Sequence, residues 1–356
     1  MESVVYYVIG VMSGTSLDGI DLAYIQFKKE EHWNYNIIHK ETVAYTSEWK
    51  SNLSKAVNFT TNQLTVLNEE YTCLLATVIT DFIEGYAISN ITAVCSHGHT
   101  ILHQPEKGIT LQIGNLEKLA KLIQQTVICD FRVQDVQMGG QGAPLVPIGD
   151  RLLFAEYNYC LNLGGFSNIS TELSGKRIAY DICPVNIVLN HYVQQLGLVY
   201  DAGGKIAATG VIHAGLLETL NSIDYYQQQF PKSLGLEWVQ QNIFPLIDSY
   251  HLSIEDILRT FVEHIAMQIS SQFAKKGKVL VTGGGAYHIF LINRLRAMST
   301  QQIIVPDAAL IEFKEAVIFG FLGVLRMRNE NNVLASVTGA SKNHSSGVIF
   351  HYKKSY

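Results

Sequence analysis

The stretch Val8–Asp21, VIGVMSGTSLDGID, decides how the first part of this chain folds. An apolar strand, Val4–Ile9, enters a turn of glycine and small hydroxyl residues, and a second apolar run, Ile20–Phe27, leaves it. Such a hairpin exposes several backbone N–H groups at one point, and a concavity of that kind binds anions, usually phosphate. The turn has the spacing of neither a P-loop nor a dinucleotide-binding motif. An ordinary glycine-rich hairpin is the alternative, because glycine, serine and aspartate are also the commonest turn formers.

Two carboxylates accompany this turn, Asp18 and Asp21. Mg²⁺ prefers oxygen ligands and often binds one or two carboxylates together with substrate phosphates. The pair is therefore a candidate for holding magnesium on a bound phosphate.

Composition bounds the class of protein. The chain has 356 residues, of which 47% are hydrophobic and 16% charged, so we expect a compact globular protein of two domains. The formal charge of −5 and the lack of a Lys/Arg cluster argue against nucleic acid as a partner. The apolar runs are too short to span a membrane, and Glu2 followed at once by a strand argues against a signal peptide. The five scattered cysteines indicate buried thiols in a reducing compartment, so we expect a cytoplasmic protein.

Along the first half, strands come first and then alternate with helices. Apolar residues spaced for one helical face predict a long helix; they are Leu64, Leu67, Tyr71, Leu74, Leu75, Val78 and Phe82. We expect further strands over 35–38, 91–95, 109–113 and 126–130, and a helix over 116–123. His97 and His99 follow the strand 91–95, so we place both at a turn, and no acidic or thiol partner has metal-ligand spacing with them.

The stretch Phe131–Asp150 contains MGGQGAPLVPIG, which is rich in glycine and proline and has no period. We interpret it as a crossover between domains that also lines a cleft. After it, a strand over 159–163, a turn at Gly164 and Gly165 and a returning strand over 169–173 repeat the opening pattern. This repeat suggests two related domains, each with a phosphate-binding turn, although so short a similarity also arises by chance.

The rest of the second half continues the alternation. Pro184 opens one predicted helix, and Ser253 caps another with Asp256 three residues on. A strand over 278–281 precedes the triplet Gly283–Gly285 and a helix over 288–298. Glycines between a strand and a helix let a phosphate or a flat ring rest on the backbone, although α/β proteins also use such turns for packing. Three glycine turns at strand ends favour a nucleotide held between two domains.

With these motifs in place, the chain resembles the anhydro-N-acetylmuramic acid kinase family, part of the acetate and sugar kinase, heat-shock chaperone and actin superfamily. The matching segments run from end to end: MSGTSLDGID (12–21), SHGHT (96–100), TLQIGN (110–115), CDFRVQDVQMGGQGAPLVP (129–147), LNLGGFSNIS (161–170), AYDICPVN (179–186), DAGGKIAATG (201–210), PKSLGLEW (231–238), VLVTGGGAYH (279–288) and SVTGASK (336–342).

The resemblance implies an α/β protein of two ribonuclease H-like domains, as in actin-like ATPases, with ATP in the cleft between them. It places the first domain at 1–131 plus 333–356 and the second at 132–332. It also implies a homodimer that acts on a small sugar, with ATP and Mg as cofactors. Composition adds the expectation of a cytoplasmic protein with no nucleic acid or membrane partner.

The implied reaction is ATP-driven opening of a 1,6-anhydro sugar ring with phosphorylation at O6, in cell-wall sugar recycling. Water attacks the anomeric carbon, which requires a general base. Asp181, in AYDICPVN, matches the family's carboxylate and is the candidate base. The alternative for Asp181 is a helix N-cap, a common role for aspartate before a helix.

The resemblance also distributes the other roles. The residues assigned to ATP are Gly14, Thr15, Ser16, Leu17, Asp18, Gly19, Ile20, Asp21, Gly164, Gly165, Gly283, Gly284 and Gly285, with Asp18 as the metal neighbour. Glu315 and His97 are assigned to the sugar side. The role of Arg132 is a hypothesis from chemistry alone: its guanidinium could pair with the lactyl carboxylate as a bidentate fork. The alternative for Glu315 is a surface glutamate in the first turn of a helix.

Some positions depart from the family pattern. Cys183-Pro184-Val185-Asn186 replaces a glycine-containing turn, Asn190 stands where aspartate is usual, and His99 where glutamine is usual. Bulkier residues beside Asp181 put the identity of the sugar in question more than ATP binding. Two alternatives therefore stay open, a catalytically weakened ATP-binding regulator and a kinase for another amino sugar.

Overall fold

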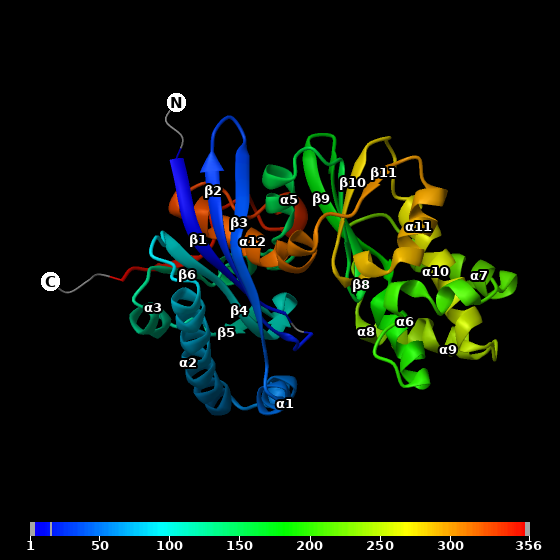
Figure 1. Cartoon of the computed structure of the whole chain (residues 1–356), viewed down its shortest axis with the longest axis horizontal. Coiled ribbons are helices and arrows are strands. Elements are labelled where there is room, and N and C mark those ends of the chain that lie inside the picture. Colours follow the sequence, from blue (N-terminus) through cyan, green and yellow to red (C-terminus); the bar gives the residue numbers. More distant parts are fainter. Residues whose placement is uncertain (1–3, 15, 353–356) are drawn as a thin grey trace. The chain divides into compact units, whose positions relative to one another are not determined.

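The computed structural model describes residues 4–14 and 16–352, so Thr15 of the predicted phosphate turn lies outside the described residues. The chain divides into two compact units, Met1–Leu153 with Phe313–Tyr356 (unit 1) and Phe154–Glu312 (unit 2) (Figure 1). The sequence-based division assigned 132–153 and 313–332 to the second domain, whereas in the structure both segments pack within unit 1.

Unit 1 is a sheet with helices on its faces. Its strands are β1 (Val4–Ser13), β2 (Gly19–Lys29), β3 (Trp33–Ala44), β4 (Ala93–Gln104), β5 (Ile109–Ile113), β6 (Val127–Cys129) and β12 (Val348–Phe350). Its helices are α1 (Ser47–Lys55), α2 (Thr61–Gly85), α3 (Lys118–Ile123), α4 (Val133–Gln137), α5 (Pro147–Leu153), most of α12 (Ala308–Met327) and α13 (Ala335–Thr338). The main path runs β12-β6-β4-β1-β2-β3, and β5 pairs with β4.

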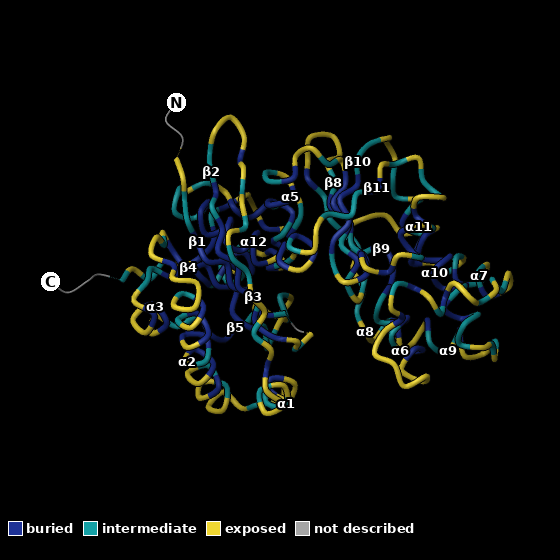
Figure 2. The backbone as a smooth tube through the Cα atoms, viewed as in Figure 1, coloured by how far each residue is buried: buried dark blue, intermediate teal, exposed yellow. Residues whose placement is uncertain are grey.

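One face of this sheet is covered by α2. Its buried residues, including Leu67, Tyr71 and Leu75, belong to the same hydrophobic cluster as Ile9 and Val11 of β1. Figure 2 shows how buried and exposed positions alternate along the backbone. The helix begins with a capping box, in which Thr60 accepts from the Gln63 N–H and the Gln63 side chain accepts from the Thr60 N–H. Such a cap satisfies two backbone donors that the first helical turn leaves unpaired. The predicted long helix and its apolar face are confirmed.

The opposite face is covered by α12, which approaches β1 very closely at Gly10. A Cβ built on Gly10 would lie 1.9 Å from the Ala316 carbonyl oxygen, and one on Gly323 would lie 2.1 Å from the Cys95 sulfur. Glycine at position 10 is therefore required because the backbones of strand and helix are in contact.

We expect Gly10→Ala to lower the free energy of unfolding by roughly 1–3 kcal/mol, because neither backbone can move aside without disturbing the core. Urea denaturation measures the change. Gly85→Ala is the matched control, since a Cβ at Gly85 has no neighbour within 4 Å. Equal stability of the two variants would contradict the close contact.

Unit 2 is built around a second sheet, ordered β11-β10-β7-β8-β9. Its strands are β7 (Tyr159–Leu163), β8 (Phe166–Leu173), β9 (Lys176–Pro184), β10 (Lys278–Thr282) and β11 (Gln302–Ile304). Its helices are α6 (Asn186–Val193), α7 (Ala214–Asn221), α8 (Leu236–Asn242), α9 (Phe244–Asp248), α10 (Ile254–Ser270) and α11 (Ile289–Met298). As predicted, Ser253 caps α10 by accepting from the Asp256 N–H.

The two sheets share one topology. In each, three sequential strands form an antiparallel meander (β1-β2-β3 and β7-β8-β9). The first strand of each meander then pairs in parallel with a later strand, β4 or β10, which pairs in parallel with a further one, β6 or β11. The predicted α/β class is confirmed, and the shared order supports the internal duplication inferred from the two glycine turns.

Several local predictions were wrong. His97 and His99 do not lie at a turn but inside β4, because Gly98 adopts a φ of +73° and the strand continues through an irregularity. The aperiodic stretch 131–150 contains α4 and the start of α5, which are short enough to leave no period. Pro184 ends β9 instead of opening a helix. All five cysteines are free thiols, but Cys73 is exposed.

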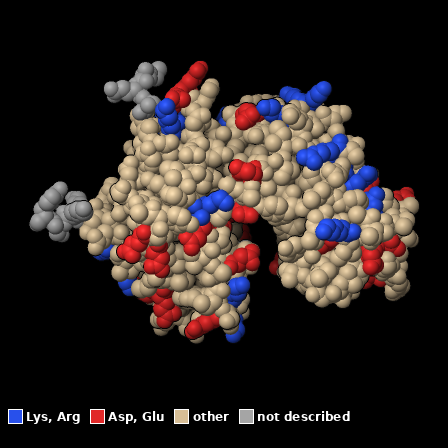
Figure 3. All heavy atoms as spheres, in the orientation of Figure 1, with Lys and Arg blue, Asp and Glu red and all other residues tan. Residues whose placement is uncertain are grey.

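Within the described residues, every helix is either too short or too polar to traverse a lipid bilayer. On the face drawn in Figure 3, acidic and basic side chains are interspersed in a larger uncharged surface.

Candidate active site

In both units the candidate residues gather where parallel strands end. In unit 1, Gly14 and residues 16–18 follow β1, His97 lies in β4 and Arg132 comes three residues after β6. In unit 2, Gly164 follows β7 and Gly283 follows β10. In open α/β sheets, ligands bind outside the carboxyl ends of the strands. The topology therefore brings together, within each unit, residues that lie far apart in the sequence.

The turn after β1 leaves room for a ligand at Gly14. A Cβ there would meet only Ser16, at 3.5 Å and 4.0 Å, so packing within the described chain does not require glycine. Gly19, by contrast, is needed for packing, since its Cβ would lie 2.4 Å from the Val43 carbonyl oxygen. Leu17 has a φ of +60°. The backbone of the turn is therefore open to a ligand at Gly14, while packing fixes Gly19 at the start of β2.

The two carboxylates of this turn differ in their surroundings. Asp21 accepts a hydrogen bond of 2.6 Å from the Thr42 hydroxyl, whereas Asp18 is exposed. Among the described residues, no group of three acidic, histidine or cysteine side chains is arranged to hold a metal. The carboxylates of Asp18 and Asp21 fit Mg²⁺, which commonly uses one or two carboxylates and takes its other ligands from phosphate and water.

A buried hydrogen-bond cluster anchors the start of the turn. The Ser13 hydroxyl lies 2.5 Å from the Tyr45 hydroxyl, 2.8 Å from Nδ1 of His99 and 2.9 Å from the Tyr71 hydroxyl. Burial lowers the pKa of His99 to about 4, because a charged imidazole would lose its hydration there. The last residue of β1 is thus tied to β4 and α2, which fixes the position of Gly14.

This cluster predicts a loss of stability in mild acid. As the pH falls from about 6.5 towards about 4, the unfolded chain protonates His99 while the folded chain does not. Stability should therefore fall by up to about 1.4 kcal/mol per pH unit from this residue. Urea titrations at several pH values measure the slope. His99→Gln, which does not titrate, should show a smaller slope, and an unchanged slope would contradict the prediction.

His97 and Arg132 are joined by a hydrogen bond between their side chains. His97 is buried, and its Nδ1 lies 2.8 Å from the Gly98 carbonyl, to which it donates. Its Nε2 accepts from Nε of Arg132 at 2.8 Å, and Nη1 of Arg132 donates to the Gly142 carbonyl at 2.7 Å. Burial and the nearby Arg132 cation hold the pKa of His97 well below its ordinary value, so the ring is neutral and can accept. Both nitrogens of His97 are thus engaged, and it orients Arg132.

Arg132 keeps free donors. Burial lowers the pKa of its guanidinium to about 10, so it remains charged at neutral pH, and the charges of Glu315 and Asp135 favour that form. Two of its five N–H groups bond to His97 and Gly142, and Nη2 has no hydrogen-bond partner among the described residues. Arg132 can therefore offer a directed cation to an anionic ligand.

Glu315 lies in the third turn of α12, so the alternative of a first-turn glutamate is wrong. Its side chain is exposed. Protein atoms around its carboxyl group nevertheless desolvate that group and raise its pKa, and the positive charges of Arg132 and Lys314 oppose this rise. Lys314 itself pairs with Asp150 at 2.7 Å in a buried contact. Glu315 is therefore accessible to a ligand and electrostatically coupled to Arg132.

In unit 2, two glycine turns and the start of a helix lie together. The Gly164 and Gly165 carbonyls accept from the N–H groups of Val185, Asn186 and Ile187 at 2.8–3.3 Å. The Asn186 side chain donates to the Leu163 carbonyl at 3.3 Å and lies beside Gly285. The turn after β7, the start of α6 and the turn after β10 therefore form one structure. The sequence indicated the turns at Gly164–Gly165 and Gly283–Gly285 separately but not the linking role of Asn186.

The glycines of these turns fall into two kinds. A Cβ on Gly283 would lie 2.5 Å from the Asn162 side-chain oxygen at a φ of +81°, and one on Gly285 would lie 2.7 Å from the Leu163 Cβ. Those two are needed for the fold. Gly164, Gly165 and Gly284 have no neighbour closer than 3.4 Å to an added Cβ, so within the described chain their backbone is open to an approaching ligand.

Asp181 lies inside β9, opposite Asn168 of β8. It is not a helix cap: the N-cap of α6 is Val185, so the capping alternative is wrong. Its backbone N–H donates to the Lys232 carbonyl at 3.1 Å, and its Oδ2 accepts from the Leu234 N–H at 2.9 Å. Burial raises the pKa of Asp181, and the Leu234 hydrogen bond opposes that rise. The segment around Leu234 thus fixes the carboxylate, a contact that no sequence signal indicated.

The unusual turn after Asp181 is packed into the core. Cys183 and Val185 are both fully buried, and the Ser167 hydroxyl donates to the Cys183 carbonyl at 3.0 Å. Burial raises the pKa of the Cys183 thiol to about 12. The two bulky side chains therefore point into the hydrophobic core of unit 2 and act on its packing.

Comparison with known proteins covers the whole chain. The family model for anhydro-N-acetylmuramic acid kinase matches residues 6–352. A protein of that name from Pseudomonas savastanoi pv. phaseolicola is 32% identical over 97% of this chain and 99% of its own length. One from Pasteurella multocida is 32% identical over 99% of both chains. Among solved structures, component A of (R)-2-hydroxyglutaryl-CoA dehydratase from Acidaminococcus fermentans aligns with a TM-score of 0.44 and 11% identity, over 88% of this chain and 95% of its own.

Proposed function

The chain belongs to the anhydro-N-acetylmuramic acid kinase family, a family of sugar kinases, and we propose that Asp181, Arg132 and the open glycine turns carry out its reaction. The two units would be the two ribonuclease H-like domains that the resemblance implies. That ATP binds in a cleft between them stays a prediction, as do the cytoplasmic location and the homodimer.

Asp181 is the proposed general base. Its carboxylate takes a proton from water as the water oxygen bonds to the anomeric carbon of the sugar. The bond between that carbon and O6 breaks, O6 bonds to the γ-phosphorus of ATP, and ADP leaves. A raised pKa makes Asp181 a better proton acceptor than an ordinary aspartate, and the Leu234 N–H fixes one oxygen so that the other can face the water.

The remaining residues bind and orient. Gly14, Gly164, Gly165 and Gly284 offer open backbone at strand ends, as phosphate contacts require. Asp18 would hold Mg²⁺, which supplies neutralisation of phosphate charge, a main requirement of phosphoryl transfer. Arg132 would pair with the lactyl carboxylate of the sugar, and Glu315 would accept from a sugar hydroxyl. His97 acts on the sugar through Arg132.

One observation carries this proposal. Asp181 is held inside a strand because its backbone N–H donates to the Lys232 carbonyl and its side chain accepts from the Leu234 N–H, in the same unit as the open glycines Gly164, Gly165 and Gly284. A structural cap would lie at a helix end instead.

The test is turnover of 1,6-anhydro-N-acetylmuramic acid with ATP in ¹⁸O-labelled water. The proposed reaction places the label at C1 of a 6-phosphorylated sugar. A kinase that phosphorylates a free hydroxyl of another amino sugar incorporates no label, and a regulator yields no phosphosugar. Either of these results would contradict the proposal.

A further inference from the structure

A buried carboxylate, Asp135, lies in α4 three residues after Arg132, outside the chemistry proposed above. It is completely buried. A buried carboxylate is rare unless hydrogen bonds or charges compensate for its lost hydration. Its partners therefore indicate why the chain keeps it.

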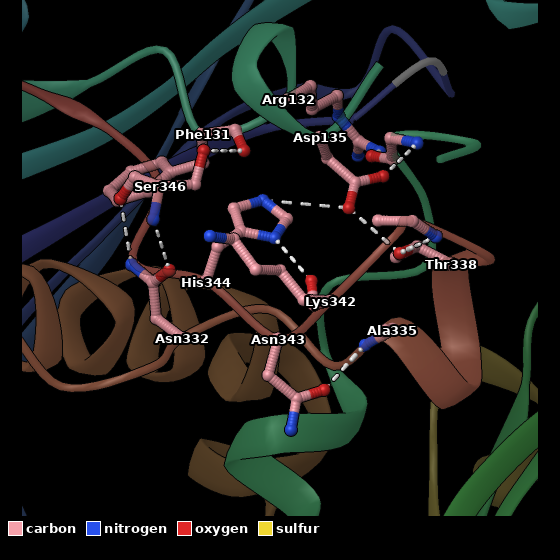
Figure 4. Close-up of polar contacts among 12 residues, drawn as sticks. Phe131, Arg132, Asp135, Asn332, Ala335, Thr338, Lys342, Asn343, His344 and Ser346 are labelled. Carbon is pink, nitrogen blue, oxygen red and sulfur yellow. Dashed lines mark hydrogen bonds and ion pairs between the residues drawn. The ribbon is translucent and has the colours of Figure 1, made fainter. Parts of the chain in front are cut away.

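The partners come from two segments far apart in the sequence. Oδ2 accepts from the Gly142 N–H at 2.7 Å, and Oδ1 accepts from the Thr338 hydroxyl at 2.8 Å (Figure 4). Nε2 of His344 lies 3.6 Å from the same Oδ1. Asp135 thus joins the loop after α4 to the segment that follows α12.

Backbone contacts fix the same two segments against each other. The Gln141 N–H donates to the Thr338 carbonyl at 2.8 Å, and the Ser341 N–H donates to the Met138 carbonyl at 3.1 Å. A Cβ on Gly140 would lie 2.2 Å from Oδ2 of Asp135, so the carboxylate fits directly beneath the glycine-rich loop. The loop position depends on a side chain that occupies this space and accepts hydrogen bonds there.

The loop in turn holds Arg132. Both backbone polar groups of Gly142 form hydrogen bonds: its N–H donates to Asp135, and its carbonyl accepts from Nη1 of Arg132. His97 holds Nε of the same guanidinium. If Gly142 were displaced, Arg132 would keep only its hydrogen bond to His97, and the guanidinium could rotate about that bond.

We propose that Asp135 is a positioning residue, which acts through Gly142 to aim Arg132 at the carboxylate of the sugar, with Thr338 holding Asp135 in place. The proposal rests on the proposed function, in which Arg132 pairs with that carboxylate. It makes the C-terminal segment 338–344 part of sugar selectivity, although none of its residues is assigned to the ligand.

The experiment compares two substrates, 1,6-anhydro-N-acetylmuramic acid and 1,6-anhydro-N-acetylglucosamine, which lacks the lactyl group. The quantity measured is the ratio of their kcat/KM values. Asp135→Asn should lower this preference about tenfold, because an amide presents only one acceptor oxygen where two donors need one each. Thr338→Val should lower it in the same direction, and Thr338→Ser, which keeps the hydroxyl, should retain it.

A double variant separates positioning from general damage. If Asp135 acts through Arg132, adding Asp135→Asn to Arg132→Ala should cause no further loss of preference. Equal loss of kcat/KM on both substrates in Asp135→Asn and Thr338→Val, or additive losses of preference, would overturn the positioning role while leaving the proposed function intact. An unchanged preference in Arg132→Ala alone would overturn the carboxylate pairing itself and this proposal with it.

Discussion

Replacement of Asp181 by asparagine is expected to lower kcat by about 10²–10⁴-fold, the usual contribution of a positioned general base. Asparagine keeps the shape and can still accept from the Leu234 N–H, so the strand and the turn beside it should be preserved. Nucleotide affinity, measured by calorimetric titration, should stay within about twofold, since the open glycines and not Asp181 are assigned to the phosphates. Steady-state rates with purified protein give the loss.

The pH dependence of the rate adds a second test of Asp181. The base must be ionised, so activity should fall in acid as the carboxylate protonates, at a pH above that of an ordinary aspartate because burial raises its pKa. The residual activity of Asp181→Asn should not show this fall in acid. Asp224→Asn, at an exposed carboxylate of the same unit, is the control and should keep both rate and profile. Full turnover by Asp181→Asn would exclude it as the base.

The second large effect is expected at Arg132. Arg132→Ala should lower kcat/KM for the lactyl-bearing sugar by about 10²-fold or more, the loss typical of a charged partner left unpaired in a partly buried site. Most of the loss should fall on KM, because the carboxylate is bound equally in the ground and transition states. Arg132→Lys should recover only part of it, since a lysine cannot form the planar fork.

The analogue without the lactyl group is the control for this prediction. Its kcat/KM should fall much less in Arg132→Ala than that of the lactyl-bearing sugar, because it has no carboxylate to lose. An equal loss on both sugars would mean that Arg132 supports the fold or another ligand group. A loss confined to the KM for ATP would place it on the nucleotide side instead.

Much of the fold follows from local sequence signals. The hairpin of β1 and β2, the long helix α2 and the strand β7 match their predicted positions, because apolar periodicity and capping residues act over a few neighbouring positions. The same signals failed at His97 and His99, where a glycine with positive φ lets the strand continue through residues that resemble a turn. They also left two roles open for Asp181, a general base and a helix N-cap, since an aspartate just before a helix is typical of a cap.

The sequence by itself determined the family, the α/β class with its repeated strand–turn–strand pattern, and the residue types that carry the chemistry. Only the tertiary structure decided which of those residues are held and by what. The Leu234 N–H on Asp181, His97 and Gly142 on Arg132, and Thr338 on Asp135 all join positions distant in the chain. Such contacts depend on strand order and loop packing, and no local pattern of residues encodes them.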